Sequence, residues 1–348
     1  MKKILALILT ALLVMSMTAA LAADFNNVDD QDLSEVLDKA VVFAKAYNVS
    51  GGDSPDVSFT FRFTDTAPTY SYNGESATFP TTNKPTVAFG TGNPAAFSGD
   101  DAKEGEHSKN VTISISITQD TPLGVYTYEF EEVDPQIAGV TMSDKGPFKL
   151  IVTVLTDEDG TKHYVGAIRD KNGDKIDTIT NTFAASSLAV TKTVTGNMAD
   201  RTKYFKFEIT LSSTSGTLDP SAITLAVGDN PLSVAETITS GEGYQFDEEN
   251  NKYTVYLKHG DTVTLENIPV GVSYTVKETY APYTPNKTNG QATGTITTTA
   301  STEEFINELK NEIDTGIILQ YAPYIAILAV VLAGAALLII RRRRNNED

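Results

Sequence analysis

The stretch "TITNTFAASSLAVTKTV" (residues 178–194) places two polar residues on strand faces that are otherwise apolar. Side chains of a β-strand alternate between its two faces, so Asn181 shares a face with Ile179 and Phe183. By the same rule, Lys192 shares a face with leucine and valine side chains. The pattern therefore predicts that an amide and an amine are buried in apolar surroundings.

Similar alternation runs through most of the chain. Short runs rich in Thr, Val, Ile, Tyr and Phe, such as "VSFTFRFT" and "NVTISISIT", are separated by Gly, Asn, Asp and Pro. The small polar stretch "AASS" (184–187) separates two segments of similar internal order. We predict an all-β chain with two tandem Ig-like β-sandwiches, at 24–185 and 186–311, joined by a short hinge.

The two ends of the chain carry hydrophobic segments of different kinds. Residues 1–23 combine two lysines, an apolar stretch and a small-residue exit, which is typical of a secretory signal peptide. The uncharged run 316–340 exceeds the roughly 20 helical residues that span a bilayer core, and the four arginines 341–344 after it are typical of a stop-transfer cluster. We therefore expect a secreted, cell-surface protein whose region 312–348 holds a transmembrane helix and a basic cytoplasmic tail.

Composition narrows the classes of partner. The 348 residues carry a formal net charge of −18, and several of the basic residues lie in the two terminal segments. A surface this acidic disfavours nucleic acid and anionic lipid as partners. Cysteine is absent, so disulfides cannot strengthen the chain in an oxidising compartment.

Polar residues expected to face inward occur in the same order in both segments. Each segment has a lysine in an early strand, a glutamate in a late strand and an asparagine in the last strand: Lys45, Glu132 and Asn181, then Lys192, Glu278 and Asn307. Alternation directs all of them toward the buried side of their strands. Lys39 has the same parity as Lys45 and is the alternative for the first lysine.

Burial gives these residues a specific chemistry. Desolvation favours the neutral amine of a buried lysine and the neutral acid of a buried glutamate. A neutral amine can attack a carboxamide carbon, while the acid donates to the amide carbonyl and transfers the proton to the departing ammonia. The pattern predicts one Lys–Asn isopeptide bond in each segment, formed once and without turnover.

Several motifs resemble a known family. "YTVKETYAP" (274–282) resembles the E-box of Cna-B-type domains, and "VSFTFRFT", "VYTYEFEEV" and "TITNTF" are similar to the Gram-positive pilin isopeptide-linkage domain. This tandem, followed by a membrane anchor, resembles backbone pilins and wall-anchored surface proteins. The resemblance implies cross-links that join Lys45 to Asn181 and Lys192 to Asn307, promoted by Glu132 and Glu278.

The stretch "NEIDTGIILQYAPYIAI" (311–327) resembles a sortase sorting signal, in which a transpeptidase cleaves between Thr and Gly. Thr315 and Gly316 match, whereas Asp314 stands next to the threonine in a motif that usually includes proline. The resemblance implies sortase as a partner, with peptidoglycan or other pilin subunits as the acceptor. A plain transmembrane anchor is the alternative.

Two other classes of function compete with a structural subunit. A ligand-binding adhesin could present a face to a glycan or host protein, and a surface hydrolase would need a catalytic cluster. His107, His163 and His259 are scattered through the sequence, so we expect surface histidines and no metal site or cofactor. We therefore expect no enzyme activity beyond the single bond-forming event in each sandwich.

Overall fold

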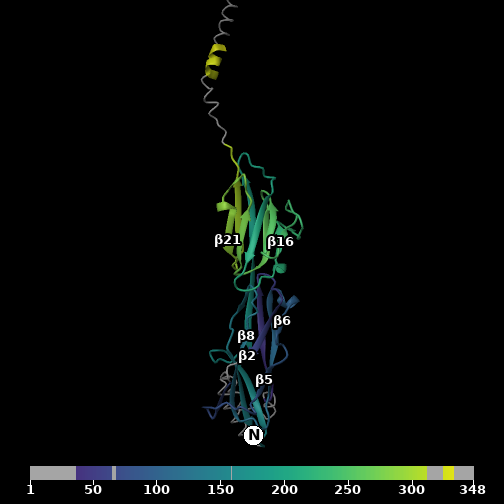
Figure 1. The fold of residues 1–348 in the computed structure, drawn as a ribbon, viewed down its shortest axis with the longest axis vertical. Coiled ribbons are helices and arrows are strands. Elements are labelled where there is room, and N and C mark those ends of the chain that lie inside the picture. The colour runs from purple at the N-terminus through teal and green to yellow at the C-terminus, as the bar shows by residue number, and fades with distance from the viewer. Residues whose placement is uncertain (1–36, 65–67, 158, 312–323, 333–348) are drawn as a thin grey trace, which may run out of the picture.

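The computed structural model describes residues 37–64, 68–157, 159–311 and 324–332, and almost all of its regular structure is β-strand (Figure 1). The first half of the chain holds β1 (Val41–Ser50), β2 (Val57–Phe63), β3 (Thr69–Tyr72), β4 (Glu75–Ala77), β5 (Thr86–Phe89), β6 (Ala95–Phe97), β7 (Gly105–Ser116), β8 (Gly124–Val133), β9 (Val140–Met142), β10 (Phe148–Thr156) and β11 (Lys162–Arg169). The long strand β12 (Thr178–Thr195) follows. The expectation of an all-β chain is confirmed for these residues.

The second half holds the remaining strands: β13 (Phe205–Ser212), β14 (Thr224–Val227), β15 (Asn230–Pro231), β16 (Gln245–Asp247), β17 (Lys252–Leu257), β18 (Thr262–Pro269), β19 (Ser273–Glu278), β20 (Thr284–Pro285), β21 (Gln291–Thr295) and β22 (Ser301–Glu308). Among the described residues, three short 3-10 helices connect strands: η3 (Gly99–Ala102), η4 (Pro220–Ala222) and η5 (Thr288–Gly290). An α-helix occupies 324–332.

Two sheets enclose the first core. One contains β5, β7, β1, the first half of β12 and β9, and the other runs in the order β11-β10-β8-β2-β6. Alternation produces this packing, because every second residue of β1 is buried. Aromatic rings from both sheets meet in the core, as in the edge-to-face pair Phe43 and Phe61, whose centroids are 5.0 Å apart.

A second pair of sheets encloses a second core. The first sheet continues through β15, β14, β18, the second half of β12, β22 and β20, and it faces a sheet with the order β16-β17-β13-β19-β21. The two units lie end to end along the long axis of the molecule, with β6 in the lower unit and β16 in the upper unit of Figure 1. Ala138, from the first half of the sequence, packs in the second core.

The stretch 184–187 is not the hinge that we expected. It lies inside β12, which runs without interruption from one unit into the other. Ser186 and Ser187 are both outside the cores, and a register shift against β18 falls between Ser186 and Leu188. Before the shift the buried residues of β12 have odd numbers, and after it they have even numbers. The two units are therefore joined by a strand with a local irregularity and not by a flexible linker.

Close backbone contacts fix the junction between the two units. The Asn267 side-chain nitrogen donates to the carbonyl oxygens of Asp53 and Ala222, at 2.9 and 3.0 Å. Gly51 has φ +72°, and a Cβ added there would lie 2.2 Å from the carbonyl oxygen of Ala185 in β12. Only glycine fits both this backbone conformation and this approach.

The predicted signal peptide, the sorting motif and much of the predicted membrane segment lie outside the described residues. In the part of the chain that the structure describes, no helix is both long and apolar enough to cross a membrane. The anchoring of the chain therefore stays a prediction.

Candidate cross-linking sites

The first core holds three of the predicted residues in contact. Lys45 Nζ lies 2.9 Å from Glu132 Oε1, and both side chains are fully buried. Asn181 Nδ2 donates to the same Glu132 oxygen at 2.8 Å. Lys39, the alternative lysine, is exposed and precedes β1, so the structure favours Lys45.

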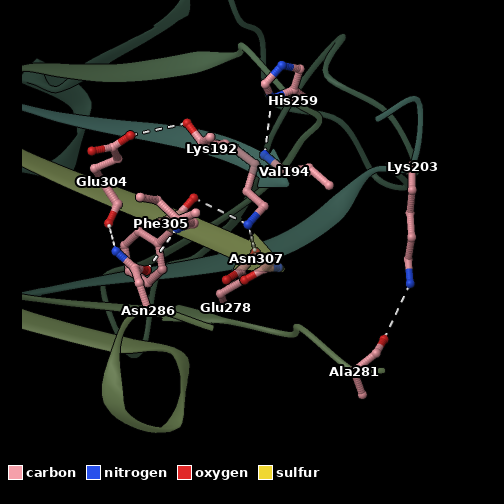
Figure 2. A network of polar contacts seen from close by, with 12 residues as sticks. Lys192, Val194, Lys203, His259, Glu278, Ala281, Asn286, Glu304, Phe305 and Asn307 are labelled. Atoms are coloured by element: carbon pink, nitrogen blue, oxygen red, sulfur yellow. Dashed lines mark hydrogen bonds and ion pairs between the residues drawn. The ribbon is translucent and has the colours of Figure 1, made fainter. Parts of the chain in front are cut away.

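The second core repeats this geometry. Lys192 Nζ lies 2.9 Å from Glu278 Oε1, again with both side chains fully buried. Asn307 Nδ2 donates to that oxygen at 2.8 Å, and Lys192 Nζ also donates to the carbonyl oxygen of Phe305 at 3.3 Å. Figure 2 shows the Lys192 amine directed toward Glu278 and Asn307.

Strand pairing explains why the lysine and asparagine of each site meet. β1 and β12 are parallel, and Asn181 is opposite Tyr47, two residues beyond Lys45. β12 and β22 are also parallel, and Asn307 is opposite Val194, two residues beyond Lys192. A two-residue offset keeps both side chains on one face, where diagonal neighbours are within reach of a long side chain.

Each glutamate reaches its site from the facing sheet. Glu132 is opposite Phe61 in the pairing of β8 with β2. Glu278 is opposite Phe207 in the pairing of β19 with β13. The carboxyl group therefore crosses between two sheets to contact the lysine and asparagine of the first sheet.

An aromatic ring lies beside each lysine, and our sequence reasoning missed both rings. Lys45 Nζ is 4.5 Å from the centroid of Phe59, and Lys192 Nζ is 4.6 Å from that of Phe205. Phe59 lies two residues before Phe61, which is opposite Glu132, and Phe205 lies two residues before Phe207, which is opposite Glu278. Because this spacing is the same in both segments, the repeated order could have revealed the two rings. The rings exclude water while their π-faces attract a protonated amine.

Burial shifts the ionisation of all four charged groups. Desolvation lowers the pKa of Lys45 from 10.5 to about 8, although Glu132 opposes the shift. Desolvation also lowers the pKa of Lys192, and it raises the pKa values of Glu132 and Glu278. The amines are thus pushed toward their nucleophilic form and the carboxyl groups toward their acid form.

The contacts are compatible with the predicted proton transfer to the departing ammonia but differ from the prediction in one hydrogen bond. We expected the glutamate to donate to the amide carbonyl, but one carboxyl oxygen contacts both the amine nitrogen and the amide nitrogen. The carbonyl oxygens Asn181 Oδ1 and Asn307 Oδ1 are buried without a hydrogen-bond partner among the described residues. The bridging oxygen can therefore take a proton from the nucleophile and give it to the leaving group.

The three histidines are partly exposed, and His163 and His259 make specific contacts. His163 Nδ1 lies 2.7 Å from Asp38 Oδ2, and the ring is only 24% exposed. His259 is half-buried, and its Nδ1 accepts the backbone N–H of Val194 at 3.0 Å. No cluster with the composition of a metal site occurs among the described residues. Thr315 and Gly316 lie outside those residues.

The chain has counterparts among known proteins. Over 255 residues, or 67% of the chain and 72% of the relative, it is 29% identical to the "Pilin" of Streptococcus pyogenes serotype M1. It is 37% identical over 105 residues to the "Pilus tip adhesin Cpa" of Streptococcus pyogenes, which is 30% of this chain and 13% of that protein. The chain has homologues among Gram-positive pilus proteins.

Solved structures and a domain family complete the comparison. The major pilin from Streptococcus pyogenes aligns with 78% of this chain and 99% of its own, at 19% identity and a TM-score of 0.44. A pilus-presented adhesin (Cpa) aligns with 47% of this chain and 37% of its own, at 26% identity and a TM-score of 0.30. Residues 186–309 match a family described as a domain of unknown function (DUF7601).

Proposed function

We propose that this chain is a structural subunit or adhesin stalk of a Gram-positive cell-surface pilus, and that one Lys–Asn isopeptide bond closes each of its sandwiches. The homology to pilins supports the pilus role. The observation that carries the cross-links is the buried carboxyl oxygen that contacts an amine and an amide in each core.

The bond forms by attack of a neutral amine on an amide. In the first site Lys45 Nζ bonds to Asn181 Cγ, and the Cγ–Nδ2 bond breaks. Glu132 in its acid form gives its proton to Nδ2, which leaves as ammonia, and takes one proton from the attacking amine, so the carboxyl group ends protonated. Lys192, Asn307 and Glu278 act in the same way in the second site, and neither reaction needs a co-reactant.

Bond formation also relieves an electrostatic cost. A buried ammonium and carboxylate lose their hydration, and their mutual attraction only partly offsets the loss. The product is a neutral secondary amide beside a carboxyl group that can remain protonated. The reaction therefore converts a costly buried pair into a covalent tie between neighbouring parallel strands.

Anchoring to the cell surface completes the proposed role. Sortase would cleave between Thr315 and Gly316 and transfer the chain to peptidoglycan or to another pilin subunit. Support for this step comes from the motif at 311–327 and from the pilin homologues. A plain membrane anchor would leave the C-terminal hydrophobic segment attached.

The intact mass of the protein tests the cross-links. We expect the purified full chain to lack the mass of two ammonia molecules relative to its sequence after any signal-peptide loss. Peptide mapping should recover one cross-linked peptide with Lys45 and Asn181, and another with Lys192 and Asn307. A wild-type chain whose mass equals that of its sequence would rule out both bonds.

Polymer formation separates the pilus role from an adhesin on a membrane anchor. Co-expression with the sortase of the native host should give a ladder of high-mass species that survives hot detergent. Substitution of Thr315 by Ala should abolish the ladder while the two ammonia losses persist. A chain that stays monomeric with active sortase and keeps its C-terminal segment would favour the plain-anchor adhesin.

A further inference from the structure

The two cross-linking sites differ in what supports their strands from outside. In the first site β7 pairs with β1 at Lys45, and β9 pairs with β12 at Asn181. Both reacting residues therefore lie on strands with a neighbouring strand on each side. Continuous ladders fix their backbone positions without help from side chains.

In the second site, the pairing of β12 with β18, its neighbour on one side, ends before it reaches Lys192. The pairing of β18 with β12 ends at Thr191 opposite Thr262, one residue before Lys192. The turn 258–261 extends it by one residue, because Lys192 N–H donates to the Asp261 carbonyl at 2.9 Å and Gly260 N–H donates to the Lys192 carbonyl at 2.8 Å. Among the described residues, no strand lies beyond that turn to bond the next outward N–H, that of Val194.

The side chain of His259 takes the place of the missing strand. Its Nδ1 accepts the Val194 N–H at 3.0 Å, at the end of β12 where the chain leaves the sheet. Val194 is the residue opposite Asn307, so this contact fixes the part of β12 that sets the offset between Lys192 and its target. Figure 2 shows His259 on the opposite side of Lys192 from the carboxyl and amide groups.

The partner strand is already fixed on its own outer side. The Asn286 side chain donates to the Glu304 carbonyl at 3.1 Å and accepts the Ile306 N–H at 2.8 Å. Its backbone N–H also donates to the Ile306 carbonyl. Asn286 thus brackets the β22 segment that leads to Asn307. β12 is paired with β22 through Thr195 on one side, and on its other side the Val194 N–H is held by the His259 ring.

We propose that His259 is a positioning residue for the second cross-link, which it assists by holding Val194 and hence Lys192 in register with Asn307. This inference rests on the proposed isopeptide chemistry. Nδ1 acts as an acceptor, which requires the tautomer with hydrogen on Nε2. Loss of the contact would loosen β12 at Val194 on the side away from β22, and misplacement of a nucleophile slows attack steeply.

Three substitutions of His259 test whether the hydrogen-bond acceptor at the position of Nδ1 matters apart from the rest of the imidazole ring. In His259→Asn, Oδ1 can occupy the position of Nδ1 and keep the bond to the Val194 N–H. In His259→Gln the amide lies farther along the side chain, and in His259→Ala it is missing. The full chain would be pulse-labelled in the expressing cells, and peptide mapping during the chase would follow both cross-links in the same molecules.

We expect His259→Gln and His259→Ala to slow the second cross-link about tenfold, the effect of losing one hydrogen bond of about 1.4 kcal/mol. His259→Asn should restore a rate near that of the wild type, and the first cross-link should form normally in every variant. The ¹⁵N-edited spectrum of Glu278→Gln, which cannot form the second bond, should show the Val194 amide proton shifted when His259→Ala is added.

Other outcomes decide against the inference or against its premise. Equal rates for the Asn and Gln variants, or a second cross-link at the wild-type rate in both, would overturn the positioning role. If His259→Ala does not fold, the comparison of His259→Asn with His259→Gln still tests the positioning role. Absence of both cross-links from the wild type would instead refute the proposed function.

Discussion

Asn181 and Lys192 lie on one continuous strand, β12, yet each is buried in a different core. In the proposed arrangement, Asn181 is the last cross-linked residue of the first unit along the chain, and Lys192 is the first cross-linked residue of the second unit. Tension would thus pass from Lys45 to β12 and on to Asn307 through two covalent bonds. The long folded segments between the tied residues would carry none of it.

Loss of one glutamate should remove one cross-link and lower the stability of one unit. We expect Glu132→Gln to restore the mass of one ammonia and Glu278→Gln that of the other. Each loop closes most of a unit, so the lost constraint on the unfolded state is about 4–5 kcal/mol in the entropic description. Differential scanning calorimetry with mass measurement on the same samples checks both effects.

Glu131→Gln is the matched control for this prediction. Glu131 is adjacent to Glu132 but lies on the exposed face, where it pairs with Arg62. A surface pair of this kind contributes at most about 1 kcal/mol, so both ammonia losses and the unfolding temperature should stay close to wild type. A similar loss of stability in Glu131→Gln would contradict the assignment.

Pulling on the chain should reveal the covalent path. With both cross-links intact, force applied across residues 37–311 should give no unfolding extension from either unit. Glu132→Gln should release the segment between Lys45 and Asn181, with about 3.3–3.6 Å of contour per residue. Single-molecule force spectroscopy measures this, and an unfolding event of that length in the wild type would contradict the path.

The buried pair should give an unlinked variant an unusual dependence on pH. In Asn181→Ala the amine and carboxyl group remain but cannot react. Lys45 has a folded pKa of about 8, below its ordinary value of 10.5, so the unfolded chain binds more protons between these values. Its free energy of unfolding should therefore rise from about pH 8 to 10.5, by up to about 1.4 kcal/mol per pH unit.

Glu132 contributes with the opposite sign in acid. Its pKa is raised by burial, so the folded chain binds more protons above the ordinary pKa of 4.5, and stability should fall as pH rises from there. Denaturant unfolding from pH 4 to 10.5 should thus show a minimum between the two ranges. In the double variant Asn181→Ala with Lys45→Met, the rise in the free energy of unfolding at alkaline pH should disappear. If the rise persists, a group other than Lys45 causes it.

The ring of Phe59 should tune the amine of Lys45. Phe59→Leu keeps the site dry but removes the π-face that favours the ammonium, so the pKa of Lys45 should fall by about one further unit. Phe59→Ser should admit water and raise the pKa instead. The ¹³Cε shift of Lys45, titrated in the Asn181→Ala background, measures both, and shifts in the same direction would contradict this role of the ring.

The junction should be sensitive to a single methyl group. Gly51→Ala adds a Cβ that would meet the Ala185 carbonyl in a backbone with φ +72°. Gly74→Ala is the matched control, since Gly74 has φ +82° and open space around it. We expect the control to lose about 1–2 kcal/mol from backbone strain alone and Gly51→Ala to lose more. Equal losses in thermal unfolding would mean that the junction yields to the added group.

Much of the molecule follows from local pattern. The period-two alternation of apolar residues predicted the strands, and it pointed Lys45, Asn181 and Lys192 inward because buried positions in a strand recur at every second residue. The repeated order of lysine, glutamate and asparagine singled out the residues that meet in each core. These features depend on residue type and spacing, which the sequence contains.

Other features depend on contacts between distant segments. Alternation around "AASS" was compatible with a hinge, and only the pairing of β12 with strands of both units showed one continuous strand with a register shift. The ring of Phe59 and the Nδ1 of His259 reach their sites through strand pairing and a turn that no local pattern specifies. The sequence alone thus predicted that the lysine, glutamate and asparagine side chains of both sites would be buried. The tertiary structure decided the strand register and the surrounding contacts, because register and facing sheets arise from long-range packing.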